Sequence, residues 1–255
     1  MTTTAGFSTV SVNGVELAYR EQGAGEPLLL LHGFFGSSAD WVHLFDLDDL
    51  ARRYRLIMPD ARGHGRSTNP TGAFTHRLCA ADVRALLDHL GLARVKAVGL
   101  SLGGGTLFHI ATQDPNRVEA MVLIGAPSYF PVKARALTAA TSDRDEDHPE
   151  AEWRELRARH VQGDEQIRAL WRIARGFATS YDDMAFTPPL LATIRARTLI
   201  VTGDRDGLYP VEMFVEQFRA IPGAALMVIP DGGHHAVFGA ARPDFVRAAL
   251  AFLRG

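Results

Sequence analysis

The pentapeptide Gly99-Leu100-Ser101-Leu102-Gly103 lies between an apolar run that predicts a buried strand and a second run that predicts a helix. The two glycines let the backbone approach its neighbours closely, so the central serine can occupy a tight, strained turn. Such a turn raises the serine hydroxyl out of the sheet, where a substrate carbonyl can reach it. The pattern therefore predicts a strand–turn–helix unit that presents a nucleophile.

Apolar runs alternate with segments of helical periodicity along most of the chain. The runs that predict a hairpin and further strands are 10–19, 27–32, 55–59, 95–100, 118–124, 198–203 and 225–230. The segments that predict helices are 78–90, 102–113, 213–220 and 245–253. This alternation predicts an α/β fold with a mostly parallel sheet flanked by helices.

A charged region without any buried-strand run interrupts the alternation between residues 127 and 189. Within it, 150–160 and 164–177 have the pattern of helices. We expect residues 127–189 to form a helical cap inserted after the sixth strand. Residues 1–126 and 190–255 would then form the core, which is an ordinary size for one large domain.

Ser101 needs a base, because a serine hydroxyl is almost un-ionised at neutral pH. His234 follows the last strand in a glycine-rich segment and is the favoured base, with its neighbour His235 as the alternative. The acid that orients the base is expected after strand 198–203, where Asp206 is favoured and Asp204 is the alternative. The order Ser, Asp, His along the chain is typical of this type of serine turn.

Attack on a carbonyl also requires N–H donors for the oxyanion. The Leu102 N–H, at the start of a helix, and the Phe34 N–H, in the turn His32-Gly33-Phe34-Phe35-Gly36, are the predicted pair. We expect the cap and the loops to form an apolar substrate pocket around them. Its candidate residues are Phe35, Phe130, Trp171, Phe177, Met184, Phe186, Leu208 and Phe238.

The segment Asp60-Ala61-Arg62-Gly63-His64-Gly65-Arg66-Ser67 also combines an acid, a histidine and a serine. We interpret it as structural, because its glycines suit a tight loop whose charges pair internally.

Composition limits the classes of partner that we expect the chain to bind. The net charge of −2 favours neither nucleic acid nor an anionic membrane surface, and no apolar stretch approaches the ~20 residues that span a bilayer. The single cysteine, Cys79, allows no disulfide within the chain, which fits a cytoplasmic protein. No metal-ligand spacing or dinucleotide fingerprint is present, so we expect neither a metal nor another cofactor. The sequence is also compatible with the formation of a homo-oligomer.

These motifs together resemble the α/β-hydrolase fold superfamily over nearly the whole chain. A serine nucleophile argues against the dehalogenases and epoxide hydrolases of this fold, which use aspartate. Leu100 stands where ring-cleavage carbon–carbon hydrolases usually carry asparagine, and His235 stands where hydroxynitrile lyases carry lysine. The pattern looks most like small serine esterases, enol-lactonases and cofactor-free perhydrolases.

The resemblance implies a hydrolase of small esters or lactones that works through a Ser-His-Asp triad and an acyl-enzyme. A carbon–carbon hydrolase of a diketone, a perhydrolase or an acyltransferase on the same triad is the alternative. A third hypothesis is that the protein is a ligand receptor without catalytic activity, because one fold hosts many functions.

Overall fold

The structure of the chain is a computed structural model that describes residues 6–142 and 144–255. Residues 1–5 of the predicted core and residue 143 of the predicted cap lie outside this range. The described residues form one eight-stranded sheet. Its strands are β1 (Ser8–Val12), β2 (Val15–Gln22), β3 (Glu26–Leu31), β4 (Tyr54–Pro59), β5 (Val95–Leu100), β6 (Val118–Ile124), β7 (Arg197–Gly203) and β8 (Ala225–Ile229).

The strand order is β1-β2-β4-β3-β5-β6-β7-β8. β1 and β2 form the predicted hairpin, whose turn residues Asn13 and Gly14 both have positive φ, as a tight two-residue turn requires. The hairpin joins β4 in antiparallel fashion, and the pairs from β4 to β8 are parallel. The predicted α/β class and mostly parallel sheet are therefore confirmed.

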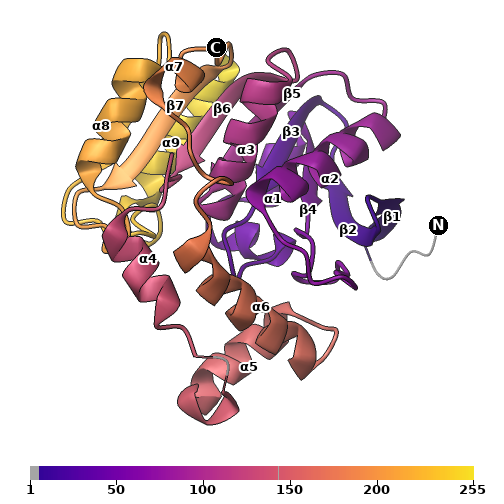
Figure 1. Cartoon of the computed structure of the whole chain (residues 1–255). Helices are drawn as coiled ribbons and strands as arrows, with labels where there is room; N and C mark the ends of the chain where they lie inside the picture. Colours follow the sequence, from indigo (N-terminus) through magenta and orange to yellow (C-terminus); the bar gives the residue numbers. More distant parts are fainter. Residues whose placement is uncertain (1–5, 143) are drawn as a thin grey trace.

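The helices cover both faces of the sheet (Figure 1). They are α1 (Leu47–Ala51), α2 (His76–His89), α3 (Leu102–Gln113), α4 (Val132–Ala139), α5 (Glu150–Arg159), α6 (Asp164–Gly176), α7 (Pro188–Leu191), α8 (Val211–Ala220) and α9 (Arg242–Arg254). Short 3-10 helices lie at η1 (Ser38–His43), η2 (Asp145–Asp147), η3 (Phe177–Thr179) and η4 (Gly239–Ala241). Sequence periodicity did not indicate α4 or α1, which are short and bury few residues.

Two apolar cores result from the alternation of side chains along the strands. In β3, Leu29 and Leu31 face a core shared with α2, α3 and α8. Leu28 and Leu30 face the opposite core, shared with α1 and α9. A strand buried on both faces must be apolar throughout, which explains the continuous leucine run in the sequence.

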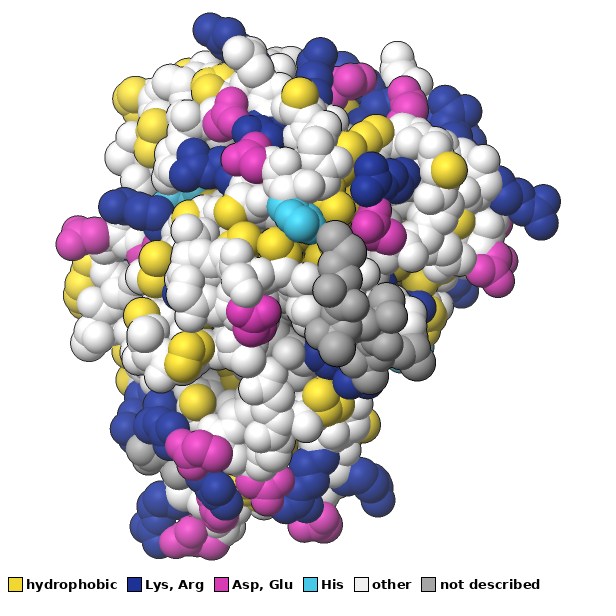
Figure 2. Space-filling model, turned by 90° about the vertical axis from the view of Figure 1, so that its right-hand side faces the viewer, with side chains coloured by type: hydrophobic (Ala, Val, Ile, Leu, Met, Phe, Trp, Pro, Cys, Tyr) yellow, Lys and Arg dark blue, Asp and Glu magenta, His cyan; other side chains and the backbone are white. Residues whose placement is uncertain are grey.

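The chain leaves the sheet after β6 and returns at β7, and the segment between these strands contains the predicted insert, residues 127–189. Its helices α4, α5 and α6 gather at one end of the molecule (Figure 1). Figure 2 shows basic and acidic side chains interspersed at this lower end, where pairs such as Arg157 with Asp164 and Arg168 with Asp145 lie. Among the described residues, no helix has the length and apolar character needed to cross a membrane.

Candidate active site

Ser101 occupies the sharp turn between β5 and α3, with φ of +48° and ψ of −105°. The two glycines of the pentapeptide make this turn sterically possible. A Cβ on Gly99 would lie 2.6 Å from the Gly103 carbonyl carbon, and a Cβ on Gly103 would lie 2.0 Å from the Leu31 carbonyl oxygen. Because neither neighbour is a flexible side chain, both positions require glycine.

The turn brings Ser101 together with two side chains from distant loops. The Ser101 hydroxyl lies 3.0 Å from His234 Nε2, and His234 Nδ1 lies 2.8 Å from Asp206 Oδ2. Ser101 follows β5, Asp206 follows β7 and His234 follows β8, so all three occupy loops at the carboxyl ends of parallel strands. That edge is where such sheets present their ligand-binding groups.

Asp206 is held as an acceptor. Its side chain is 1% exposed, and Oδ1 accepts hydrogen bonds from the backbone N–H groups of Leu208 and Tyr209. Burial by itself would raise the pKa of Asp206, but the hydrogen bonds from His234 and from these two amides lower the pKa below its ordinary value. Asp206 therefore stays ionised beside the imidazole at neutral pH.

The two sequence alternatives lie elsewhere. His235 is exposed, and the ring contacts of its side chain within the described part of the chain are with His234 and Phe238. Asp204 is also exposed, and its carboxylate lies 3.9 Å from Arg205. Neither side chain forms part of the hydrogen-bonded array at Ser101.

Two backbone N–H groups border the array. Leu102 is the first residue of α3, and Phe34 lies in the turn that follows β3. Among the described residues, neither of these two N–H groups donates a hydrogen bond to another group. Both N–H groups are therefore available as hydrogen-bond donors.

A cleft of about 440 Å³ opens beside the array. It is bounded by the turn after β3, by Leu100 just before the serine, and by His235 and Phe238 just after His234. Its lining also includes Arg159 of α5 and Asp40 of η1, which pair at 3.1 Å.

The predicted pocket residues fall into four groups. Phe35 and Phe238 line the cleft, and Leu208 is partly buried beside Asp206. Phe130 and Phe177 lie against each other, with ring centroids 5.4 Å apart, and Phe177 also contacts Phe34 at 5.1 Å. Deeper positions are taken by the remaining three residues, Met184, Phe186 and Trp171, which are almost fully buried. The Phe186 ring packs against Phe108 and His109, and the Trp171 ring packs against His148 and Trp153.

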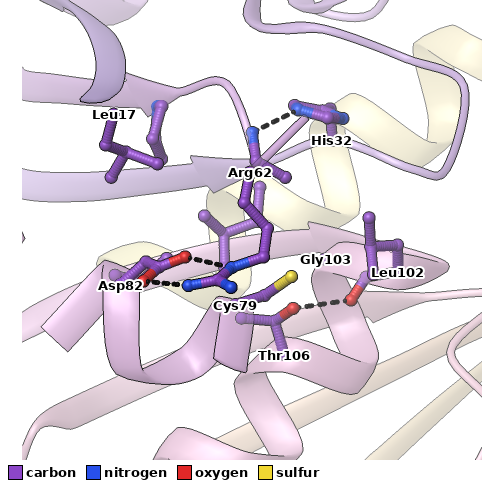
Figure 3. Close-up of a pocket in the computed structure, with 12 residues that line it drawn as sticks. Leu17, His32, Arg62, Cys79, Asp82, Leu102, Gly103 and Thr106 are labelled. Carbon is purple, nitrogen blue, oxygen red and sulfur yellow. Dashed lines mark hydrogen bonds and ion pairs between the residues drawn. The ribbon is translucent and has the colours of Figure 1, made fainter. Parts of the chain in front are cut away.

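In the Asp60–Ser67 loop, Asp60, Arg62, His64 and Ser67 are buried, as the structural interpretation expects, although His64 Nε2 has no hydrogen-bond partner among the described residues. Asp60 accepts the N–H groups of Ser38 and Arg66. One detail of the interpretation was wrong, because Arg62 pairs outside the loop. Figure 3 shows its guanidinium directed at Asp82 of α2, with N–O distances of 2.7 and 2.9 Å. These residues border a small internal cavity of about 20 Å³.

Two sets of buried hydrogen bonds, made by Asp183 and His160, could not be predicted from the sequence. Asp183 of the insert accepts hydrogen bonds from His76 Nδ1 at 2.7 Å and from the backbone N–H groups of His76 and Arg77, so it joins the insert to the start of α2. His160 of the insert contacts two core loops through its ring nitrogens. Each hydrogen-bond partner lies about a hundred positions away in the sequence, so a local sequence pattern cannot indicate the contact. No group of residues suited to a metal ion occurs within 6–142 or 144–255.

Comparison with known proteins identifies the fold. A protein-family model of the alpha/beta hydrolase fold matches residues 26–150. A hydrolase from Pseudomonas aeruginosa PA01 has the same fold, with a TM-score of 0.79 and 27% identity, over 99% of this chain and 100% of that one. The chain belongs to the α/β-hydrolase fold superfamily.

This α/β-hydrolase is also similar to the enol-lactonase from Burkholderia xenovorans LB400, with a TM-score of 0.75, 26% identity and coverage of 97% of this chain and 100% of that one. Among curated proteins it is 28% identical over 246 residues to the dihydrolipoyllysine-residue acetyltransferase component of the acetoin cleaving system of Cupriavidus necator, covering 90% of this chain and 64% of that protein. The soluble epoxide hydrolase of Corynebacterium and three uncharacterized mycobacterial proteins are matched over 33–39% of their length. The chain thus spans about a third to two thirds of these curated relatives.

Proposed function

We propose that this α/β-hydrolase cleaves small carboxylic esters or lactones through an acyl-enzyme formed on Ser101. One observation carries the proposal: the Ser101 hydroxyl, His234 and the buried Asp206 form a continuous hydrogen-bonded array at the carboxyl edge of the sheet. Nucleophilic catalysis by serine requires this arrangement of nucleophile, base and orienting acid.

The reaction would proceed in two steps. Ser101 Oγ attacks the carbonyl carbon while His234 Nε2 takes the hydroxyl proton, and the Phe34 and Leu102 N–H groups stabilise the oxyanion. Collapse of the intermediate breaks the bond to the alkoxy oxygen, which receives the proton from His234. Water then attacks the acyl-enzyme, loses its proton to His234 and releases the acid with Ser101 restored. Asp206 holds the imidazole so that Nε2 faces Ser101 throughout.

The surroundings favour an ester or lactone. The cleft combines aromatic and apolar side chains with polar groups, as sites for small organic molecules do. The aromatic and apolar side chains are Phe34, Phe35, Trp41, Leu100 and Phe238, and the polar side chains are His32, Asp40, His43, Arg159 and His235. Leu100, the residue before the nucleophile, is one of the apolar residues that line the cleft. We further propose that the insert acts as a cap that helps to exclude water from this cleft. Esterases and a lactonase are among the relatives of the same fold.

The proposal is tested by combining active-site labelling with turnover. The protein would be treated with a fluorophosphonate, the adduct mapped by mass spectrometry, and p-nitrophenyl esters of increasing acyl length and simple lactones assayed. We expect labelling at Ser101, turnover of short or medium esters or lactones, and loss of both in a folded Ser101→Ala variant.

Two outcomes would overturn the proposal. Retained turnover in Ser101→Ala would move the nucleophile elsewhere. Labelling of Ser101 without hydrolysis of any ester or lactone would favour the alternatives, which diketone cleavage and peracid formation from hydrogen peroxide would then separate.

A further inference from the structure

The turn that carries the Phe34 N–H contains a strained residue. The Gly36 N–H donates to the Gly33 carbonyl at 3.0 Å, and Phe35 at the third position has a φ of +62°. Turns of this shape usually place glycine or asparagine there. A bulky residue in that region is strained and persists only where its surroundings hold it.

Contacts that hold Phe35 come from the insert. The Phe35 side chain packs against a cluster of Trp153, Leu156, Ile167 and Trp171 on α5 and α6. Its carbonyl oxygen accepts a hydrogen bond from His160 Nε2 at 3.2 Å. One residue earlier, Arg159 Nε donates to Asp40 Oδ1 at 3.1 Å. The residues at the end of α5 therefore hydrogen-bond to both ends of the segment 35–40, at Phe35 and at Asp40.

The second ring nitrogen of His160 fixes its orientation and tautomer. Nδ1 accepts the Gly65 N–H at 2.9 Å, so the proton of the neutral ring lies on Nε2, facing Phe35. The side chain is 1% exposed, and burial, together with the nearby His32, lowers the pKa of His160 to about 4. At neutral pH the ring is therefore neutral, with one donor and one acceptor, and each is satisfied.

The Asp60–Ser67 loop completes this connection. Asp60 Oδ1 accepts the Ser38 N–H at 2.7 Å, and Gln166 Nε2 of α6 donates to the carbonyls of Gly63 and Gly65. His160 thus lies between two segments that are themselves joined. The Asp60–Ser67 loop is therefore hydrogen-bonded both to the segment that follows the turn and to α6.

We propose that His160 is a positioning residue, whose Nε2–H···O=C bond to Phe35 holds the Gly33–Gly36 turn in the strained form that presents the Phe34 N–H to the oxyanion. This inference rests on the proposed function, because the Phe34 N–H is one of its two oxyanion donors. It also makes the oxyanion site depend on the seating of the insert.

Two substitutions separate the two hydrogen bonds of His160. In His160→Gln the amide nitrogen reaches the position of Nε2 and can still donate to Phe35. In His160→Asn the amide oxygen reaches the position of Nδ1 and can still accept from Gly65, but no donor reaches Phe35. We expect kcat on the best ester of the panel to fall about 10- to 100-fold in the Asn variant, with KM changed by less than about 3-fold, since misplacing a donor costs that much. The Gln variant should stay within about 3-fold of wild type.

Amide hydrogen exchange at Gly36 and Ser37 gives a second readout that does not require turnover. We expect faster exchange at these amides in the Asn variant and near-normal exchange in the Gln variant. Equal losses of kcat in the two variants, or equal exchange rates, would overturn the inference and leave His160 as a packing residue. Absence of Ser101 labelling and ester turnover in the wild type would refute the proposed function, while the exchange contrast would still decide whether His160 holds the turn.

Discussion

Replacing Asp206 by asparagine preserves the shape of the side chain and removes its charge. Asp206 Oδ1 already accepts the N–H groups of Leu208 and Tyr209, so the asparagine oxygen should take that place. Its NH₂ group would then face His234 Nδ1, across the 2.8 Å now spanned by Oδ2. The imidazole would have to accept at Nδ1 and carry its proton on Nε2, the nitrogen that must take the proton from Ser101.

The expected loss is large because the wrong tautomer cannot act as a base. Where this exchange has been made in a Ser-His-Asp triad, kcat falls about 10⁴-fold, which corresponds to about 5.4 kcal/mol of transition-state stabilisation. The 1% exposure of the side chain leaves no room for water to replace the carboxylate. We therefore expect a loss of about 10⁴-fold in kcat/KM for Asp206→Asn.

Asp204→Asn is the matched control, two positions away in the same loop. Asp204 is exposed, and its 3.9 Å pair with Arg205 is at the surface, so its loss should change kcat/KM by less than about 2-fold. Ester hydrolysis by both variants would be measured alongside their thermal midpoints, to confirm that each is folded. A larger loss in Asp204→Asn, or a loss below 10-fold in Asp206→Asn, would refute the assignment of the orienting acid.

Three further predictions concern stability. Asp183→Ala should destabilise the protein by about 3–5 kcal/mol, because it leaves buried partners unpaired, whereas the exposed Asp182→Ala should change the thermal midpoint little; equal midpoints would contradict it. Gly103→Ala should cost about 1–3 kcal/mol or more and slow Ser101 labelling, because its Cβ would meet a β3 carbonyl at 2.0 Å, while Gly207→Ala meets nothing within 4 Å and should be mild. Because the folded-state pKa of His160 is about 4 against 6.5 for the free side chain, the unfolded chain binds the proton first, and up to about 3 kcal/mol of stability should be lost as pH falls from 6.5 to 4. Denaturant titrations over that range should show a shallower decline in His160→Gln, and an identical decline would count against a buried neutral His160.

Local sequence was enough to predict most of the sheet. Strands buried on both faces read as continuous apolar runs, and β3, β5, β6 and β7 lie within a residue or two of the predicted bounds. The long helices α2 and α3 were also predictable, α2 from its periodic buried face and α3 as an apolar run, buried almost throughout, that follows the Ser101 turn. The helix α4 was not predictable, since Ala134 is its only fully buried residue and its pattern is correspondingly weak.

The candidate site was likewise only partly predictable from local sequence. Ser101, Asp206 and His234 could be proposed from sequence because each follows a recognisable strand and has glycine nearby, and the order of the three is informative. The partner of Arg62 was predicted within its own loop, but it is Asp82 on α2. Choosing between carboxylates at different sequence distances requires knowing which side chains the fold brings together.

By itself, the sequence determined the α/β class, the strained turn at Ser101 and the small set of residues from which the site could be built. These depend on short-range rules: side-chain periodicity, the steric freedom of glycine and the apolar character of buried strands. Only the tertiary structure decided that His234 rather than His235 faces Ser101, and that His160 of the insert bonds to Phe35. Those contacts join loops from different strands and helices, and their distances are set by how the sheet twists and how the insert packs, which no local pattern encodes.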